Sequence, residues 1–372
     1  MTIRSAQIVA TAGRSGVESV LRTLCLGLPG CTLISFENGP LVAELRAAGV
    51  DCHVLPVRSK FDLGAVRRLR DLLRAERFDV VHTHGARAMF IGNLAAQAAR
   101  RHPIVTTLHE FSDTRAYQTR LYWLYDRIER LLARTSTDAL VAISDAVLAD
   151  AVEVRAVPPG KIARIYSGIA LDRFFRLTER ASVADFRGAL GIQPGAPVVG
   201  VVGRLAPIKG QAYVIEAFPA VQQVYPGACL VVVGSGPDEP ALRALAASLK
   251  VPVVFAGAQS EINLVYNALD VLVVPSLSET LGLVALEALL SGTPLVASNV
   301  GGLPEIARHC PTSTRLVPPA DPPALAQAII ALLRARPQAA AAEIEALRQT
   351  FSAENFVAAT RNLYQRLLDA RR

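Results

Sequence analysis

Two glutamates lie around a predicted helix start in the second half of the chain. Residues 275–288 read Pro-Ser-Leu-Ser-Glu-Thr-Leu-Gly-Leu-Val-Ala-Leu-Glu-Ala and follow an apolar strand candidate at residues 271–274. The helix is expected to begin near Gly282, which places Glu279 in the preceding loop and Glu287 about one turn inside the helix. Free N–H groups at a helix start favour a phosphate, and carboxylates accept hydrogen bonds from sugar hydroxyls. The segment therefore predicts a site for a nucleotide sugar, with one glutamate at each sugar ring.

Either glutamate alone could be a solvated residue at a helix start, which is the usual situation. Glu287, however, interrupts the apolar run at residues 286–290, which indicates that its side chain is partly buried. A buried carboxylate without a partner is costly. The sequence therefore favours a ligand-binding role for Glu287 over a solvated one.

The motif resembles the signature of the retaining glycosyltransferases of family four, which is Glu, seven residues, Glu, and which belongs to the GT-B fold. The resemblance continues upstream in residues 202–210 (Val-Gly-Arg-Leu-Ala-Pro-Ile-Lys-Gly), 233–237 (Val-Gly-Ser-Gly-Pro) and 255–257 (Phe-Ala-Gly). Downstream it includes residues 297–305. Each motif is weak by itself, but together they follow the family's order. The resemblance extends over nearly the whole chain.

The resemblance implies a role for each matching residue. Glu279 would contact hydroxyls of the donor sugar, Glu287 would contact the ribose, and Arg204 and Lys209 would hold the diphosphate. Further donor contacts are implied at Gly16, Gly234, Phe255, Gly257, Thr280, Gly282 and Leu283, the last two through backbone N–H groups. Positive side chains and a helix start can stabilise a leaving diphosphate. Since the chain has no Asp-x-Asp pair, we expect neither a metal nor another cofactor.

The N-terminal half carries candidates for the acceptor side. Gly13 and Gly16 lie in a loop after the first strand, where glycines let backbone approach a ligand. His84 and His109 each end a predicted strand, and His109 matches a histidine near the reaction centre in several family members. A single histidine at a strand end is more often structural, which is the interpretation favoured for His82. We predict Glu279, Arg204, Lys209 and His109 as the catalytic set.

Short apolar runs alternate with helical stretches throughout, which is typical of a parallel, doubly wound α/β sheet. Strands are predicted at residues 7–12, 31–36, 80–82, 104–107, 139–143, 198–202, 229–233, 253–256, 271–274 and 295–298, with helices such as 66–77, 119–133 and 241–249 between them. The Gly- and Pro-rich segment 190–197 interrupts the series. We therefore predict two Rossmann-like domains facing a cleft, at residues 1–180 and 181–354. The resemblance implies that a last helix, 355–372, returns to the first domain.

Charge is distributed unevenly along the chain. Residues 1–180 contain 25 Lys and Arg against 18 Asp and Glu, whereas residues 181–372 contain 14 of each. Five arginines between residues 67 and 77 fit either an anionic membrane surface or a solvated face. Nucleic-acid binding is disfavoured, because aromatic residues are not interspersed among the basic ones and the sequence has no helix-turn-helix or zinc-finger pattern. No apolar run is long enough to cross a bilayer and the five cysteines lack metal spacing, so we expect a cytoplasmic protein that can lie on the inner membrane face.

These observations lead to one main hypothesis and several rivals. The chain would transfer a hexosyl group with retention from a nucleotide diphosphate sugar, with UDP favoured over GDP, onto a glycan or lipid-linked acceptor of lipopolysaccharide or polysaccharide biosynthesis. The alternatives are a UDP-sugar epimerase or hydrolase on the same fold, and a non-catalytic carbohydrate-binding module. A dehydrogenase is disfavoured, because the loop that begins at Gly234 has Glu239 where a dinucleotide loop needs glycine.

Overall fold

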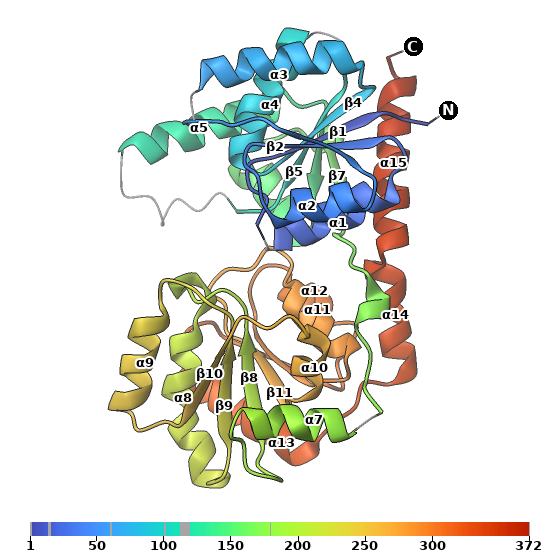
Figure 1. Cartoon of the computed structure of the whole chain (residues 1–372). Coiled ribbons are helices and arrows are strands. Elements are labelled where there is room, and N and C mark those ends of the chain that lie inside the picture. The colour runs from blue at the N-terminus through green and yellow to red at the C-terminus, as the bar shows by residue number, and fades with distance from the viewer. Residues whose placement is uncertain are drawn as a thin grey trace. The chain divides into compact units, whose positions relative to one another are not determined.

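The structure, a computed structural model, describes residues 2–13, 16–59, 62–99, 102–111, 120–178 and 180–371. The chain divides into two compact units (Figure 1). The N-terminal unit comprises Met1–Ile169 together with Phe351–Arg372, and the C-terminal unit comprises Ala170–Thr350. The sequence analysis placed the corresponding boundaries after residues 180 and 354. Each unit has its own sheet and its own core.

In the described part of the chain, the N-terminal unit contains a parallel sheet of seven strands in the order β3-β2-β1-β4-β5-β6-β7. The strands are β1 (Ser5–Val9), β2 (Cys31–Ser35), β3 (Asp51–Val54), β4 (Val80–His84), β5 (Ile104–Leu108), β6 (Ala139–Ala142) and β7 (Ile162–Arg164). All residues of β1, β2, β4 and β5 are buried. Central strands of a parallel sheet are covered on both faces, so their polar residues, such as Gln7 and His82, are buried together with the apolar ones.

Helices cover both faces of this sheet. They are α1 (Gly16–Gly27), α2 (Pro40–Ala47), α3 (Leu63–Glu76), α4 (Ala86–Ala99), α5 (Arg120–Thr135), α6 (Asp145–Ala149) and α15 (Ala353–Asp369). α1 and α2 lie on one face, and α3, α4 and α5 lie on the other (Figure 1). This division follows from right-handed crossovers, because the strand order runs from β1 outward in both directions. α15 packs against α1, so the end of the chain belongs to the N-terminal unit.

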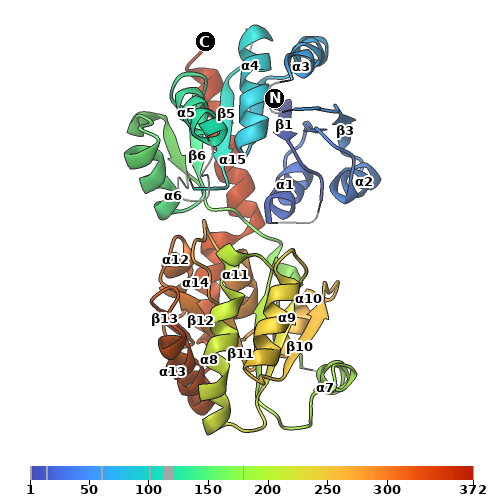
Figure 2. The ribbon, with the colours of Figure 1, turned by 90° about the vertical axis from the view of Figure 1, so that its left-hand side faces the viewer.

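The C-terminal unit contains a parallel sheet of six strands among the described residues, in the order β10-β9-β8-β11-β12-β13. The strands are β8 (Val198–Val202), β9 (Cys229–Val233), β10 (Val253–Gly257), β11 (Val271–Val274), β12 (Leu295–Ser298) and β13 (Thr314–Val317). The helices are α7 (Arg180–Ala189), α8 (Gln211–Val224), α9 (Glu239–Ser248), α10 (Ile262–Asn267), α11 (Leu283–Leu290), α12 (Leu303–Ala307), α13 (Pro322–Ala335) and α14 (Ala341–Phe351). Figure 2 shows α8 and α9 in front of the strands. The predicted fold class, two Rossmann-like parallel-sheet domains, is confirmed.

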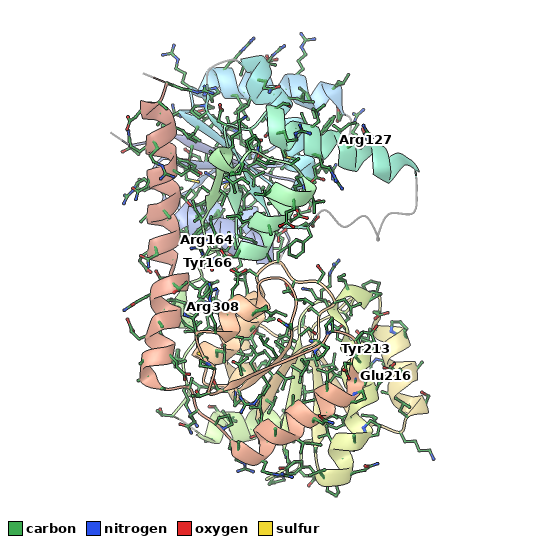
Figure 3. The ribbon with its side chains drawn as sticks, turned by 180° about the vertical axis from the view of Figure 1, so that it is seen from behind. Arg127, Arg164, Tyr166, Tyr213, Glu216 and Arg308 are labelled. Atoms are coloured by element: carbon green, nitrogen blue, oxygen red, sulfur yellow. The ribbon has the colours of Figure 1, made fainter. Side chains whose placement is uncertain are left out.

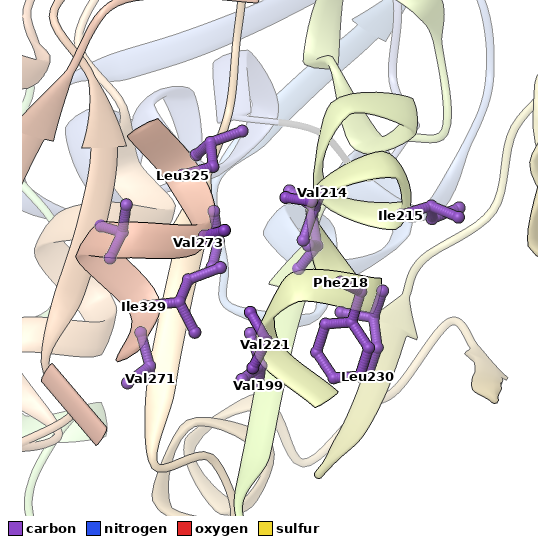
Figure 4. Close-up of a cluster of buried hydrophobic side chains, with 14 of the residues drawn as sticks. Val199, Val214, Ile215, Phe218, Val221, Leu230, Val271, Val273, Leu325 and Ile329 are labelled. Carbon is purple, nitrogen blue, oxygen red and sulfur yellow. The ribbon is translucent and has the colours of Figure 1, made fainter. Parts of the chain in front are cut away.

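The main core of the C-terminal unit lies between its sheet and the helix pair α8 and α13. Phe218 of α8 and Ile329 of α13 are fully buried beside Val199, Leu230 and Val273 of the sheet (Figure 4). Burying a side chain of this size contributes about 1.5–3 kcal/mol relative to leaving it exposed. The core holds the strands rigidly, so the loops at their carboxyl ends start from fixed positions. No described helix is both long enough and apolar enough to span a membrane.

Several helices begin at a side chain that caps them. Asp62, Ser144, Asp321 and Ser352 each accept a hydrogen bond from the backbone N–H three residues further on, at 2.9–3.1 Å. Such caps satisfy one of the free N–H groups of a first turn and are worth about 1 kcal/mol each. The Ser352 cap begins α15, so the return of the chain to the N-terminal unit starts at a defined residue.

Candidate functional site

The loop between β11 and α11, residues 275–282, carries an acid and a cation in direct contact. The Lys209 Nζ donates to the Glu279 Oε2 at 2.6 Å, and the Ser276 Oγ donates to the same oxygen at 3.1 Å. The Glu279 side chain is 12% exposed and that of Lys209 is 29% exposed. Both groups are therefore reachable by a ligand, and their charges balance each other in its absence.

Close backbone packing fixes this loop. Gly301, at φ +54°, lies so near the loop that a Cβ there would be 1.6 Å from the Glu279 carbonyl oxygen, and the Gly302 N–H donates to that oxygen at 3.1 Å. On the other side, a Cβ at Gly210 would lie 2.1 Å from the Pro275 carbonyl oxygen. Only glycine fits such contacts. These two turns therefore hold Glu279 beside Lys209.

The start of α11 has no side chain that caps it. Gly282 precedes the helix at φ +93° and, as a glycine, has no side chain that could accept a hydrogen bond from the first turn. The first N–H groups of a helix have no partner within the helix, and together with the helix dipole they attract anions. The backbone at Gly282 and Leu283 therefore offers donors to a phosphate next to Lys209 and Glu279.

Glu287 lies in α11 with its side chain largely buried. The Tyr266 Oη on α10 donates to the Glu287 Oε2 at 2.6 Å. Burial raises the pKa of Glu287 to about 7, although the Tyr266 hydrogen bond and the Arg173 charge act to lower the pKa. Burial also raises the pKa of Tyr266 well above its usual value. The tyrosine is thus neutral and donates its proton, which leaves the second oxygen of Glu287 for a ligand.

Among the other predicted donor residues, Arg204, Gly234 and Gly257 lie at the ends of β8, β9 and β10, whereas Gly16 belongs to the N-terminal unit. Arg204 follows β8; its side chain is exposed, and its carbonyl oxygen accepts from the Gln211 Nε2 at 2.9 Å. The Gly234 N–H at the end of β9 donates to the Gly257 carbonyl at the end of β10, at 2.8 Å. Thr280 lies in the Glu279 loop. The Phe255 side chain, however, packs against the main core and carries the Arg243 guanidinium over its ring, at 4.2 Å from the ring centroid.

In the N-terminal unit, the loop after β1 is followed directly by α1. Gly13 precedes the helix and Gly16 is its first residue, while Arg14 and Ser15 lie outside the described residues. Glu18, in the first turn of α1, is buried and accepts a hydrogen bond from the Thr11 Oγ1 at 2.7 Å. A carboxylate therefore lies beneath the predicted acceptor-side loop, a position that sequence analysis did not single out.

His84 and His109 are in contact at the carboxyl ends of β4 and β5. The His84 Nδ1 lies 3.2 Å from the His109 Nε2, and the two rings stack with centroids 5.5 Å apart. Burial lowers the pKa of His109 to about 4, against the opposing effect of the Glu18 charge. Burial also lowers the pKa of His84 well below its usual value, with His82 and His109 adding to the effect. Both rings are therefore neutral near pH 7.

The two histidines belong to a larger buried network, which we call the histidine network. Its members are Gln7, His82, His84, Thr107, His109 and Tyr364, and all are buried. His82 contacts the Tyr364 Oη through Nδ1 and the Thr107 Oγ1 through Nε2, each at 2.6 Å. Sequence analysis missed Gln7 and Tyr364, because a polar residue within an apolar strand and a tyrosine on an amphipathic helix carry no local signal of a shared site.

Comparisons with known proteins agree with this geometry. Residues 14–173 match the family model described as glycosyltransferase family 4, and residues 196–335 match the model described as glycosyl transferases group 1. A D-inositol 3-phosphate glycosyltransferase of Mycobacterium avium is 31% identical over 337 residues, which cover 85% of this chain and 74% of the relative. The chain belongs to glycosyltransferase family four. The predicted family is thereby confirmed, and this glycosyltransferase carries the family's two domains in order.

Two further proteins are similar to this glycosyltransferase. The UDP-Gal:alpha-D-GlcNAc-diphosphoundecaprenol alpha-1,3-galactosyltransferase of Escherichia coli is 29% identical over 279 residues, covering 73% of this chain and 71% of that protein. The crystal structure of Anabaena HepE in complex with UDP and glucose superimposes with a TM-score of 0.87 at 22% identity, over 98% of this chain and 99% of the other. This structural similarity confirms the GT-B fold.

Proposed function

We propose that this glycosyltransferase transfers a hexosyl group from a UDP-sugar to a glycan or lipid-linked acceptor, with retention of anomeric configuration. The observation that carries the proposal is the contact of Lys209 with Glu279 beside the uncapped start of α11. A cation and a carboxylate thus lie in contact beside N–H groups of a helix start, which are the groups that a sugar diphosphate would need. The UDP and glucose in the HepE complex and the UDP-Gal of the galactosyltransferase support the choice of donor.

In the proposed complex, the donor diphosphate lies against the N–H groups of Gly282 and Leu283. Lys209 and the exposed Arg204 neutralise it, since charged donors to phosphate oxygens form the stronger class of hydrogen bonds. Lys209 then turns from Glu279 toward the phosphate, and the freed Glu279 oxygen accepts from hydroxyls of the donor sugar. Glu287 accepts from the ribose hydroxyls through the oxygen that Tyr266 does not occupy.

We propose that the transfer needs no metal and no other cofactor, because Lys209, Arg204 and the start of α11 supply the positive charge that a leaving diphosphate requires. A departing phosphate oxygen would help to deprotonate the acceptor hydroxyl on the same face of the sugar. His109, with His84, Gly13 and Gly16, would act on the acceptor side. Activity that survives an excess of EDTA is expected; loss of activity that Mg²⁺ or Mn²⁺ restores would contradict metal independence.

The test of donor and stereochemistry uses the intact chain. Calorimetry with UDP-glucose, UDP-galactose and GDP-mannose identifies the base and narrows the sugar, and NMR of the product gives its anomeric configuration. We expect binding of a UDP-sugar and a product with the donor's configuration. An inverted product would contradict retention. Epimerised or rapidly hydrolysed donor in the absence of acceptor would favour the epimerase or hydrolase, and binding without turnover on any acceptor would favour a binding module.

We further propose that the acceptor is presented at the inner face of an anionic membrane, in lipopolysaccharide or polysaccharide biosynthesis. Exposed arginines on α3 (Arg67, Arg74 and Arg77) and on α5 (Arg127 and Arg134) support membrane contact (Figure 3 shows Arg127). Exposed Leu63 and Leu131 lie on the same two helices. Basic residues with apolar neighbours favour an anionic lipid surface, by about 1 kcal/mol per arginine near that surface.

Liposome sedimentation tests this contact. The variant R67Q/R74Q/R77Q should bind vesicles containing phosphatidylglycerol less tightly than the unaltered protein does. The matched control R361Q/R366Q, which removes exposed arginines of α15, should bind as the unaltered protein does. Equal recovery of the unaltered protein with neutral and anionic vesicles would contradict membrane contact. That result would not bear on the proposed donor, which calorimetry tests separately.

A further inference from the structure

Tyr364, on the last helix of the chain, is connected to His109 by an unbroken series of hydrogen bonds. The Tyr364 Oη accepts from the Gln7 Nε2 at 3.0 Å. The Gln7 Oε1 lies 2.9 Å from the His84 Nε2, and the His84 Nδ1 lies 3.2 Å from the His109 Nε2. Since Gln7 is fully buried and Tyr364 is 1% exposed, water cannot easily replace these contacts.

The orientation of the Gln7 amide determines which ring nitrogens carry protons. An amide oxygen only accepts hydrogen bonds, so the His84 Nε2 must carry the proton that it donates to the Gln7 Oε1. The His84 ring is neutral, because burial lowers its pKa, and its Nδ1 is therefore an acceptor. The His109 Nε2 must donate to that atom. The His109 Nδ1 is then left with a free lone pair.

Tyr364 holds the Gln7 amide in this orientation. The Gln7 Nε2 donates to the Tyr364 Oη and, at 3.2 Å, to the Ser5 Oγ. Because the Tyr364 hydroxyl accepts from Gln7, its own hydrogen is available to the His82 Nδ1 at 2.6 Å, and the His82 Nε2 then donates to the Thr107 Oγ1. If the Gln7 amide were reversed, every donor in the series would become an acceptor. The orientations of the Tyr364 hydroxyl and the Gln7 amide therefore depend on each other.

We propose that Tyr364 and Gln7 are positioning residues that hold His109 in the tautomer with its proton on Nε2. Buried partners commonly fix a histidine tautomer in this way. The proposal rests on the acceptor-side role proposed above for His109 and adds that its Nδ1 lone pair accepts a hydrogen bond from a sugar hydroxyl. The titratable groups that face His109 are Glu18 of α1 and His82 and His84 of β4.

Nitrogen-15 NMR of protein labelled at its histidines identifies the tautomer of each ring directly, and it does not require an activity assay. The chain has six histidines, so the H109Q variant identifies the His109 signals by their disappearance. The unaltered protein should show His109 as the Nε2–H tautomer. The variants Y364F and Q7L should each show a mixture of tautomers. The control T360V removes another buried hydroxyl of α15, which donates to the Phe356 carbonyl oxygen of the same helix at 2.9 Å, and should leave the tautomer unchanged.

Kinetics separate this proposal from the proposed function. A correctly placed proton donor or acceptor contributes about 10²–10⁴-fold to a rate, so a mixture of tautomers should lower kcat about tenfold in Y364F and Q7L, with the dissociation constant for UDP-glucose unchanged. An Nδ1–H tautomer in the unaltered protein, or a tautomer unchanged in both variants, would overturn the proposal. A shifted tautomer with an unchanged kcat would support the positioning role and overturn the acceptor-side role of His109.

Discussion

Glu279 and Glu287 have different partners, although both are placed by the same strand–loop–helix segment. Glu279 contacts a cation, Lys209, whereas Glu287 contacts the neutral hydroxyl of Tyr266. Burial without a contacting cation is what raises the pKa of Glu287 to about 7. The sequence indicated that Glu287 is partly buried, because it interrupts an apolar run. It could not indicate Tyr266, which lies 21 positions away and meets Glu287 through the packing of α10 on α11.

The affinity for UDP-glucose should depend on the ionisation of Glu287. In the proposed complex the carboxylate accepts hydrogen bonds from the ribose hydroxyls, and with a pKa of about 7 it is ionised above pH 7 and protonated below. Affinity should therefore fall about tenfold from pH 8 to pH 6. UDP-glucose is the suitable ligand, because its diphosphate does not titrate in this range. Calorimetry between pH 6 and pH 8 should show that the affinity of the E287Q control for UDP-glucose does not change with pH. An affinity of the unaltered protein that is equally independent of pH would contradict the role of Glu287.

Lys209 should matter for donor binding through its charge. K209M removes a charge-assisted hydrogen bond worth about 1.5–3 kcal/mol, so the affinity for UDP-glucose should fall about 10- to 100-fold. K209R retains the positive charge, so its affinity for UDP-glucose should fall less than that of K209M. K250M replaces an exposed lysine of the same unit and serves as the matched control, with no expected change. Calorimetry at two salt concentrations checks the result, and a K209M affinity equal to that of K250M would contradict the proposed diphosphate contact.

At the scale of elements, sequence patterns predicted the inner strands of both described sheets and one edge strand, β10 (Val253–Gly257), and missed the other three edge strands, β3, β7 and β13. β3 (Asp51–Val54) and β13 (Thr314–Val317) contain exposed and polar residues, and β7 (Ile162–Arg164) has three residues. Strands at or near a sheet edge are covered less, so they do not need a continuous apolar run. The predicted strand 7–12 is displaced from β1 (Ser5–Val9), because the small residues 10–12 (Ala-Thr-Ala) already belong to the loop. The loops of the candidate site directly follow inner strands such as β8 and β11, which the sequence predicted. The sequence therefore also located these loops.

The turn at Gly301 should be essential to the Glu279 loop. G301A adds a Cβ that would lie 1.6 Å from the Glu279 carbonyl oxygen, in a left-handed conformation that costs an L-residue about 1–2 kcal/mol. The loop must move, so the affinity for UDP-glucose should fall about tenfold or more and the Tm should drop. The control G188A lies in α7 with no atom within 4 Å of its new Cβ and should stabilise the protein by about 0.4–1 kcal/mol. Equal donor affinity in the two variants would contradict this role of the turn.

At the scale of the whole molecule, the N-terminal unit is assembled from both ends of the chain. Phe356 and Tyr364 of α15 are buried in it, and the hydrogen bond between Tyr364 and Gln7 joins residues 357 positions apart. The resemblance to a known family implied the return of the last helix, but the amphipathic pattern of that helix could not identify its partner. Contacts over such separations arise from the complete fold, and local propensity does not encode them.

Deletion of residues 351–372 should affect the two units differently. The N-terminal unit loses α15 and exposes the buried Gln7 and His82, so it should unfold at a lower temperature and show increased hydrogen exchange in β1 and β4. The C-terminal unit keeps all of its strands and its core, so UDP-glucose should still bind with an affinity within about threefold of the original. Calorimetry and hydrogen exchange check both outcomes. Loss of donor binding in the truncated protein would contradict independent stability of the C-terminal unit.

The split origin of the N-terminal unit also has a consequence for biosynthesis. During translation, α15 is synthesised after all of residues 170–350, so the N-terminal unit cannot be completed before the C-terminal unit has been synthesised. Multidomain chains generally fold from the N-terminus as they emerge, whereas the first unit of this chain must wait for a helix that follows the second. The nascent segment up to residue 169 is therefore the part that a chaperone should hold until α15 has emerged.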